Sequence, residues 1–260
     1  MIQSVTNAAQ RAEFARRIRR QPYFEATMGT HCALFGQHPA SGWCFYLLPG
    51  RGALALRGGT ATLCGTLPQG EAGEEATEEL EGFLRFLGVE RLLCPRPVLP
   101  GWQQEPPLRL WELPRGAQLP LPAPPPGALT LAEQPAMLPV SRLVFPDSEA
   151  EQEAFYTLAC TSIAHGIGCC RALLDGSTPV CTVGCYEESD EEAYLSAGVT
   201  APEWRGRRLA GWLIVRTANE LAGQRTVRFA SAPELEAFYT RLGFTPAGKI
   251  QQFTRKWETV

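Results

Sequence analysis

A short turn late in the sequence carries residue types that bind anions. The turn holds three arginines and one glycine: Arg205, Gly206, Arg207 and Arg208. It follows an expected strand over 193–200 and precedes an expected helix over 209–222. A helix N-terminus presents unpaired N–H groups and a positive dipole end, and Gly206 lets the main chain approach a phosphate closely. The pattern indicates an anion site for a phosphorylated ligand, with an ordinary helix start and solvated arginines as the alternative.

A second segment places a tyrosine near the end of an expected helix over 233–242. Tyr239 follows Phe238 there, and Gly243 and Phe244 come directly after the helix. A phenol at such a position can give a proton to a leaving group, which makes Tyr239 a candidate general acid. Aromatic residues in this setting more often pack a core, so the residues alone leave both interpretations open.

Five acidic residues lie just before the strand that leads to the arginine turn. They are Glu187, Glu188, Asp190, Glu191 and Glu192. Such a run is typical of a solvated turn, and it can also attract a cationic amine substrate. An amine must be neutral when it attacks, so a carboxylate or a water chain has to accept its proton. The sequence does not single out one of these carboxylates as that base.

The sequence has nine cysteines, an odd number without the regular spacing of a disulfide framework. His165 and four of the cysteines lie within 165–185, where the pair Cys181 and Cys185 loosely fits the spacing of zinc ligands. On a strand, residues four apart share a face, which equally suits small apolar thiols in a core. We predict reduced core thiols and no metal site.

The composition is that of a globular protein. Of 260 residues, 45% are hydrophobic and 20% are charged, and the formal net charge of −3 argues against a general nucleic-acid binder. The longest apolar runs, such as 43–48 and 212–215, are far shorter than the roughly 20 residues of a membrane span. Residues 1–20 are rich in arginine and lack the apolar segment of a secretory signal. We therefore expect a cytoplasmic protein without nucleic-acid or membrane partners.

Proline density marks the clearest boundary along the chain. Eleven of the 22 prolines lie between Cys94 and Gly127, where they remove backbone donors and hold the chain extended. We interpret 114–127 as a semi-rigid linker. The linker separates two halves, 1–113 and 128–260, each of which is long enough to form a domain.

Each half is expected to run through an antiparallel meander and then a strand–helix–strand crossover, which gives an α/β fold with a mixed sheet. In the first half we expect helices over 7–20 and 74–87 and strands over 31–35, 43–48, 53–56, 60–64, 89–94 and 108–113. In the second half we expect helices over 148–160, 209–222 and 233–242, strands over 128–132, 169–175, 179–186, 193–200, 226–230 and 251–257, and an acidic turn over 187–192. The two halves share this topology but no motif.

Two motifs in the second half fit the patterns of a known enzyme family. Arg205-Gly-Arg-Arg-Leu-Ala210 follows a strand and occupies the place of a Gln/Arg-x-x-Gly-x-Gly/Ala turn, with Pro202 three residues before it. Phe238-Tyr-Thr-Arg-Leu-Gly-Phe244 matches the pattern Phe-Tyr-x-x-x-Gly-Phe of a later helix. This pair of motifs, in this order, resembles the GCN5-related N-acetyltransferase (GNAT) family over about 128–260.

The resemblance implies that acetyl-CoA binds in a cleft where the strands 193–200 and 226–230 diverge. It also implies that main-chain groups of Gly198, Val199 and Thr200 pair with the pantetheine arm, and that the Val199 amide polarises the thioester carbonyl. Main-chain N–H groups would hold the pyrophosphate, namely those of Gly206, Arg207, Arg208, Leu209, Ala210 and Gly211. Tyr239 would protonate the departing CoA thiolate. The implied activity is transfer of an acetyl group to a primary amine by direct attack in a ternary complex.

Two departures from the family pattern leave an alternative open. Arg208 stands at the family's central glycine, where its side chain can crowd the pyrophosphate or bind a phosphate. The asparagine often found before the later helix is missing, and Ser231 and Ala232 lie in that region. A non-catalytic acyl-CoA-binding sensor or an adaptor on the same fold is therefore the alternative to an enzyme.

The first half is expected to be a smaller, degenerate copy of the same fold. Its corresponding turn, 69–74, carries Glu71 and Glu74, which would repel a phosphate. We therefore expect no CoA site in 1–113. We expect this half to cover the substrate cleft or to form an interface, with a homodimer as one arrangement, and the acceptor amine stays unidentified.

Overall fold

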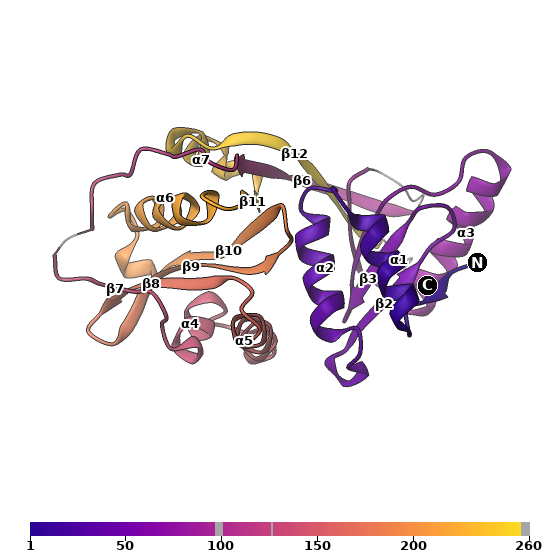
Figure 1. The fold of residues 1–260 in the computed structure, drawn as a ribbon, viewed down its shortest axis with the longest axis horizontal. Coiled ribbons are helices and arrows are strands. Elements are labelled where there is room, and N and C mark those ends of the chain that lie inside the picture. Colours follow the sequence, from indigo (N-terminus) through magenta and orange to yellow (C-terminus); the bar gives the residue numbers. More distant parts are fainter. Residues whose placement is uncertain (97–100, 126, 256–260) are drawn as a thin grey trace. The chain divides into compact units, whose positions relative to one another are not determined.

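The computed structural model describes residues 1–96, 101–125 and 127–255, which form two compact units. Unit 1 comprises Met1–Leu110, Ala230–Glu236 and the described part of Ala247–Val260. Unit 2 comprises Trp111–Phe229 and Ala237–Pro246. The chain therefore changes unit four times, and the two units are interleaved along the sequence. Figure 1 colours the ribbon by sequence, so these changes can be followed.

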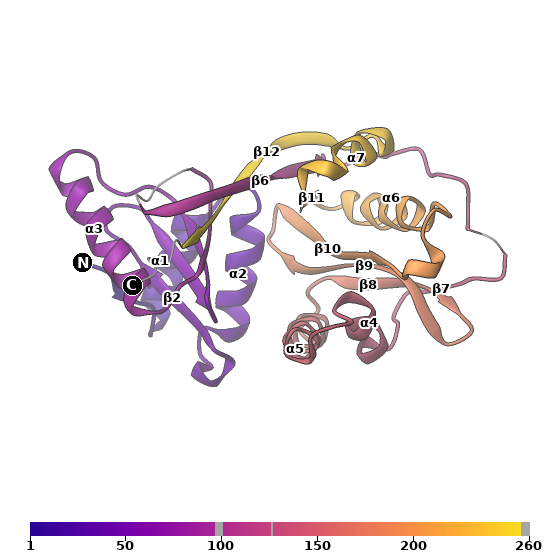
Figure 2. The same cartoon turned by 180° about the vertical axis from the view of Figure 1, so that it is seen from behind.

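Unit 2 contains a mixed sheet with strand order β11-β10-β9-β8-β7. Its strands are β7 (Thr130–Ala132), β8 (Cys169–Asp175), β9 (Thr178–Glu188), β10 (Glu192–Thr200) and β11 (Thr226–Ser231). Its helices are α4 (Met137–Val144), α5 (Glu149–Ala164), α6 (Leu209–Ala222) and most of α7 (Glu236–Leu242). The pair β10–β11 is parallel, and β7 to β10 pair antiparallel in chain order. Figures 1 and 2 show α6 on one face of β8–β10, and α4 and α5 on the other.

Both faces of the unit 2 sheet are apolar because helices cover both of them. Leu173 and Val183 belong to the core on the α6 face, together with Leu213 of that helix. Cys170 and Tyr186 belong to the core on the α4–α5 face, each offset from the first set by the alternation of a strand. This packing fixes the position of β10 and of the first turn of α6.

The strands of unit 1 pair in the order β1-β2-β3-β4-β5-β12-β6, with both antiparallel and parallel neighbours. Its strands are β1 (Gln3–Ser4), β2 (Trp43–Leu47), β3 (Ala53–Arg57), β4 (Thr60–Cys64), β5 (Arg91–Cys94), and most of β6 (Trp102–Leu113) and β12 (Thr245–Arg255). Its helices are α1 (Ala8–Ile18), α2 (Phe24–Phe35) and α3 (Glu71–Phe86). Alternation again divides the core, since Ala53 and Ala55 pack with α1 and α2, whereas Leu54 and Leu56 pack with α3.

The C-terminal strand gives a division of the chain that differs from the predicted domains 1–113 and 128–260. β12 pairs antiparallel with β5 through Gln251↔Cys94 to Thr254↔Arg91, so it completes the sheet of unit 1. It begins at Thr245, earlier than the predicted strand over 251–257, of which 256 and 257 lie outside the described residues. The partner of a strand depends on main-chain pairing across the fold, which local sequence patterns do not encode.

The predicted strand over 31–35 is wrong, because these residues end helix α2. Nine of the twelve residues of α2 are buried, so the helix is apolar nearly all round and shows no polar face. A short apolar run then looks the same whether it belongs to a buried strand or to a buried helix. Length decides such cases, and the element that contains this run is a helix that begins at Phe24.

The acidic run over 187–192 is also not a single turn. Glu187 and Glu188 belong to β9 and Glu192 begins β10, so only 189–191 connect the two strands. Helix α4 was not predicted from the sequence, whereas α6 has the predicted bounds. In the described part of the chain, none of the helices has both the length and the apolar character needed to cross a bilayer.

Candidate active site

The parallel strands β10 and β11 pair over a short stretch and then diverge. Three residue pairs join them, from Glu192↔Thr226 to Tyr194↔Arg228. Beyond these pairs β10 continues to Thr200 and β11 continues to Ser231. This divergence agrees with the arrangement that the family resemblance implies around 193–200 and 226–230, and it leaves main-chain groups of β10 without a β11 partner.

A β-bulge lies in the diverging part of β10. The register with β9 shifts between Ser196↔Gly184 and Val199↔Thr182, so two residues of β10 lie opposite one of β9. Ala197 takes the left-handed backbone conformation there, with φ of 53°. A bulge bends its strand and turns main-chain groups away from the regular ladder. The bulge was not predicted from the sequence, in which a glycine within a strand, Gly198, is the available signal.

The first turn of α6 presents open N–H groups. A 3₁₀ turn over Pro202–Trp204 follows β10, and Gly206 then adopts a φ of 78° that favours glycine. The N-cap residue is Arg208, also in the left-handed conformation with φ of 63°, and no side chain caps the helix within the described residues. Because the N–H groups of a first turn have no partner within their own helix, they remain available to an anion.

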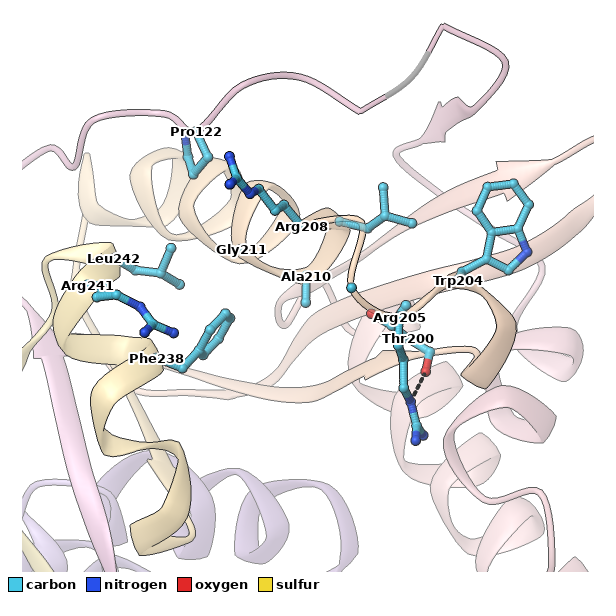
Figure 3. A pocket seen from close by; sticks show the side chains of 12 residues that line it. Pro122, Thr200, Trp204, Arg205, Arg208, Ala210, Gly211, Phe238, Arg241 and Leu242 are labelled. Carbon is cyan, nitrogen blue, oxygen red and sulfur yellow. Dashed lines mark hydrogen bonds between the residues drawn. The ribbon is translucent and has the colours of Figure 1, made fainter.

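A pocket of about 710 Å³ opens at this helix start, as Figure 3 shows. Its lining includes seven of the predicted site residues: Thr200, Arg205, Gly206, Arg208, Leu209, Ala210 and Gly211. The remaining lining residues are Pro122, Trp204, Phe238, Arg241 and Leu242. None of these twelve residues is acidic, so three arginines give the mainly apolar pocket a positive charge.

The arginines of the turn do not all serve the pocket. Arg205 lines it and donates through Nε to the Thr200 carbonyl oxygen at 3.2 Å. Arg207 does not line it, because its Nη2 donates to the Glu203 carbonyl oxygen at 3.3 Å and its guanidinium lies 4.4 Å from the centre of the Trp204 ring. Arg207 therefore braces the turn, and its predicted role is confined to its main chain.

Arg208 and Arg241 line the pocket with positively charged side chains that have no partner among the described residues. Neither side chain makes a hydrogen bond or ion pair with any described residue, and both line the pocket. Arg241 lies in the last turn of α7 and was missed from the sequence, although it falls inside the matched segment 238–244. Two guanidinium groups without a counter-ion favour binding of a multiply charged anion.

Gly211 has a packing role that was not predicted from the sequence. A Cβ atom at this position would lie 3.2 Å from Cδ2 of Leu242, so the glycine lets α6 approach α7 closely. At Gly206, in contrast, a Cβ atom would meet nothing within 4 Å, and the left-handed backbone is what favours glycine. The two glycines of the motif therefore serve different purposes.

Tyr239 lies in an aromatic cluster and does not line the pocket. Its ring centre is 4.5 Å from that of Phe229, 5.8 Å from that of Trp111 and 5.0 Å from that of Phe238. Burial raises the pKa of the Tyr239 phenol above its ordinary value. The phenol is therefore fully protonated at neutral pH, which is the state that a proton donor needs.

Two further predicted site residues, Gly198 and Val199, also lie outside the pocket lining.

Ion pairs engage much of the acidic run. The Glu192 carboxylate is buried and lies 2.6 Å from Nη1 of Arg228, whose Nη2 lies 3.0 Å from Glu112. Glu188 pairs with Arg225 at 3.4 Å. These contacts tie β6, β9, β10 and β11 together, so Glu188 and Glu192 have structural partners. Glu187 is buried on β9 opposite Tyr194.

The cysteines near the site are buried thiols. Cys181 and Cys185 lie on the α6 face of the sheet, and burial raises the pKa of the Cys181 thiol to about 11. Thr200 donates to Cys181 Sγ at 3.3 Å. Protonated, enclosed thiols of this kind are poor nucleophiles and poor metal ligands at neutral pH. Within the described residues, no three His, Cys, Asp or Glu side chains are grouped closely enough to hold a metal ion.

Unit 1 has a counterpart of this helix start with the opposite charge. Helix α3 follows β4 and precedes β5, which pairs parallel with β4. Its N-cap is Gly70, with φ of 69°, and its first turn carries Glu71 and Glu74. A pocket of about 590 Å³ at this end is lined by Glu74, Glu78 and Glu81 among others, with no arginine in its lining.

Comparison with known proteins gives relatives in structure alone. No family profile matches the chain, and no curated protein sequence matches it. A tandem GNAT protein from the clavulanic acid biosynthesis pathway, solved without AcCoA, is 17% identical with a TM-score of 0.65 and covers 98% of each chain. A GCN5-related N-acetyltransferase from Sphaerobacter thermophilus is 13% identical with a TM-score of 0.64, covering 100% of this chain and 98% of that one.

A third relative, a GCN5-related N-acetyltransferase from Kribbella flavida, is 15% identical with a TM-score of 0.59, over 90% of this chain and 97% of that one. At these identities the likeness concerns the fold. It spans both units, in agreement with the strand–helix–strand crossover that each contains. The chain thus has the GNAT fold over nearly its whole length, and it consists of two GNAT-like halves.

Proposed function

We propose that this protein is an acetyl-CoA-dependent N-acetyltransferase that transfers an acetyl group to a primary amine. One observation carries the proposal: an open helix N-terminus and three arginines line one pocket at the end of the diverging strand β10. This combination offers N–H donors and positive charge to a pyrophosphate, and unpaired strand groups to an extended arm. The GNAT fold of its structural relatives agrees with this chemistry.

The residues of the pocket divide the work of holding acetyl-CoA. Main-chain N–H groups over 206–211 bind the pyrophosphate. The side chains of Arg205, Arg208 and Arg241 neutralise the charge of the pyrophosphate and of the adenosine 3′-phosphate. The main chain of 198–200 pairs with the pantetheine arm as an added strand. Apolar side chains such as Leu209 and Phe238 exclude water along this path, which strengthens the polar contacts.

The transfer step uses one proton donor and one proton acceptor. The neutral amine attacks the thioester carbonyl carbon, the N–C bond forms, and the Val199 N–H stabilises the negative oxygen. The C–S bond then breaks, and Tyr239 gives its proton to the departing thiolate. The excess proton on nitrogen passes to a carboxylate or a water chain. The raised pKa of Tyr239 keeps the phenol protonated until the thiolate forms.

Unit 1 is proposed to lack acyl-CoA binding. The start of α3 carries carboxylates where the start of α6 carries guanidinium groups, so a pyrophosphate is repelled there. Unit 1 contains the strand that pairs with β12, and the proposed anion site lies in unit 2.

A second candidate function is a non-catalytic acyl-CoA sensor. The observation that favours it is the position of Tyr239 within an aromatic cluster, outside the pocket lining. A sensor requires the pocket but no proton donor.

The test combines calorimetry with a Tyr239→Phe variant. Wild-type protein is titrated with acetyl-CoA and then assayed for thiol release against a panel of primary amines. If the protein is an enzyme, wild type and Tyr239→Phe both bind acetyl-CoA. The rate of thiol release by the variant is then lower by about 10²- to 10⁴-fold, the usual contribution of a general acid. Phe229→Leu serves as the control, because Phe229 belongs to the same aromatic cluster as Tyr239 and does not line the pocket. Binding without thiol release from any amine in the panel supports the sensor, and absence of binding overturns both functions.

A further inference from the structure

The proline-rich segment 114–125 is fastened to α6. The N–H of Gly116 donates to the Ala222 carbonyl oxygen at 2.7 Å. Asn219 of α6 then holds both main-chain groups of Leu119: the Leu119 N–H donates to Asn219 Oδ1 at 2.9 Å, and Asn219 Nδ2 donates to the Leu119 carbonyl oxygen at 2.9 Å. A side-chain amide offers one acceptor and two donors, so one residue can pair with a chain segment as a strand would.

The side chain of Leu119 provides a second, independent anchor. It packs against the apolar core of unit 2. Its Cδ2 atom would lie 3.0 Å from a Cβ atom at residue 243, which is a glycine with φ of 95°. The end of α7 therefore leaves room for Leu119, and the segment is fixed between α6 and α7.

The anchor at Leu119 determines the position of Pro122. Prolines at 120, 122, 124 and 125 fix the backbone in an extended form that is stiff over several residues. Three residues beyond the anchor, Pro122 lines the anion pocket. Figure 3 shows Pro122 and Arg241 toward one side of Ala210 and Gly211, and Thr200 and Arg205 toward the other.

We propose that segment 114–125 forms a fixed wall of the acetyl-CoA pocket, with Pro122 contacting the nucleotide end and Asn219 as the residue that positions it. The inference rests on the proposed function. With the pyrophosphate at the start of α6, the pantetheine arm leaves past Thr200 along β10. The adenosine 3′-phosphate then extends to the other side, where the Pro122 ring offers an apolar surface to adenine and Arg241 offers charge to the phosphate.

The experiment compares three ligands by calorimetry on the full chain. They are acetyl-CoA, acetyl-4′-phosphopantetheine, which lacks the nucleotide, and adenosine 3′,5′-bisphosphate, which lacks the arm. We expect Pro122→Ala to weaken acetyl-CoA and adenosine 3′,5′-bisphosphate by about fivefold, the effect of removing a small apolar contact. The affinity for acetyl-4′-phosphopantetheine should stay unchanged. Pro124→Ala is the matched control, because Pro124 belongs to the same segment, is exposed and does not line the pocket.

Asn219→Ala should reproduce this ligand dependence and speed amide hydrogen exchange at Leu119, and Asn219→Asp, which keeps the acceptor, should lie between it and wild type. Loss of stability in α6 would instead weaken all three ligands together, and Pro122→Ala removes no hydrogen bond, so it tests the wall by itself. Equal weakening of all three ligands by Pro122→Ala, or none, overturns the wall while acetyl-CoA binding stands. Failure of the wild type to bind any of the three ligands overturns the wall and the proposed function together.

Discussion

Helices α6 and α3 begin with the same backbone device and opposite charges. Each follows one strand of a parallel pair and precedes the other, and each has an N-cap residue with positive φ, Arg208 at 63° and Gly70 at 69°. The pocket at α6 is lined by three arginines, whereas the first turn of α3 carries Glu71 and Glu74. The two helix starts therefore combine a similar backbone with side chains of opposite charge.

The strands beside these helices differ in a second way. β4 and β5 pair over Thr60↔Arg91 to Thr62↔Leu93, which matches the short pairing of β10 with β11. On its other side β4 pairs with β3 in a regular register, from Ala53↔Cys64 to Arg57↔Thr60. β10, in contrast, pairs with β9 and carries a bulge. In the described residues, the corresponding part of unit 1 thus has the same strand–helix–strand frame, with a regular register in β4 and no arginine in the pocket at α3.

The largest expected effect comes from giving α6 the charge of α3. In the double variant Arg208→Glu and Arg241→Glu, two free guanidinium groups become carboxylates facing the pocket. We expect acetyl-CoA affinity, measured by calorimetry, to fall by about 100-fold or more, since each charge-assisted contact is worth about 1.5–3 kcal/mol. Arg142→Glu, an exposed arginine on α4, is the control. A loss below threefold in the double variant would show that these charges do not hold the ligand.

Hydrogen exchange tests whether the two helix starts differ in the native protein without any substitution. Saturating acetyl-CoA should slow amide exchange over 206–213 by at least about tenfold, because a bound ligand suppresses local opening in proportion to its occupancy. The segment 68–75, at the same place relative to the N-cap of α3, should exchange at an unchanged rate. Protection of 68–75 would mean that unit 1 binds the ligand despite its glutamates.

Alkaline pH should destabilise both units, because each contains a buried thiol with a raised pKa. Burial raises the pKa of Cys94 in unit 1 and of Cys181 in unit 2 to about 11 each, against an ordinary 9.0. Above pH 9 the unfolded chain loses these protons first, so stability is present below pH 9 and falls as pH rises toward 11. The expected slope in the unfolding free energy, from urea titrations, is up to about 1.4 kcal/mol per pH unit for each thiol. Cys94→Ala should reduce that slope, and a slope that does not change would contradict burial of this thiol.

Two glycines give the smallest expected effect and compare the helices directly. A Cβ atom at Gly82 of α3 would meet nothing within 4 Å, so Gly82→Ala should raise the unfolding free energy by about 0.5–1 kcal/mol. At Gly211 of α6 the new methyl group would lie 3.2 Å from Leu242 and should cancel that gain. Urea midpoints of both variants measure the difference. Equal stabilisation would show that α6 and α7 have room between them.

The sequence was most informative where several local signals agreed on one element. Helix α6 has the predicted bounds because its apolar face, the preceding turn and Gly223 all agree on one element. The divergence of β10 from β11 followed from the family resemblance and is present in the structure. The end of helix α2, over 31–35, was predicted as a strand because burial on all sides removes the polar face that marks a helix.

The rest of the site depends on contacts between distant segments. Arg241 joins the pocket because α7 packs on Gly211, and Pro122 joins it because Asn219 holds Leu119. No spacing rule connects residues that lie about 100 positions apart. The same reason explains why β12 could not be assigned to unit 1 before the structure was known.

The position of β12 between β5 and β6 has a consequence for how the protein is made. Domains commonly fold in order as the ribosome releases them. Here the sheet of unit 1 lacks an interior strand until 247–255 have been synthesised, long after β5 and β6 have emerged. The earlier unit therefore has to wait for the later one, with open strand edges exposed meanwhile. A gene cut in the proline-rich segment would remove a strand from unit 1, so the halves should be co-expressed rather than produced separately.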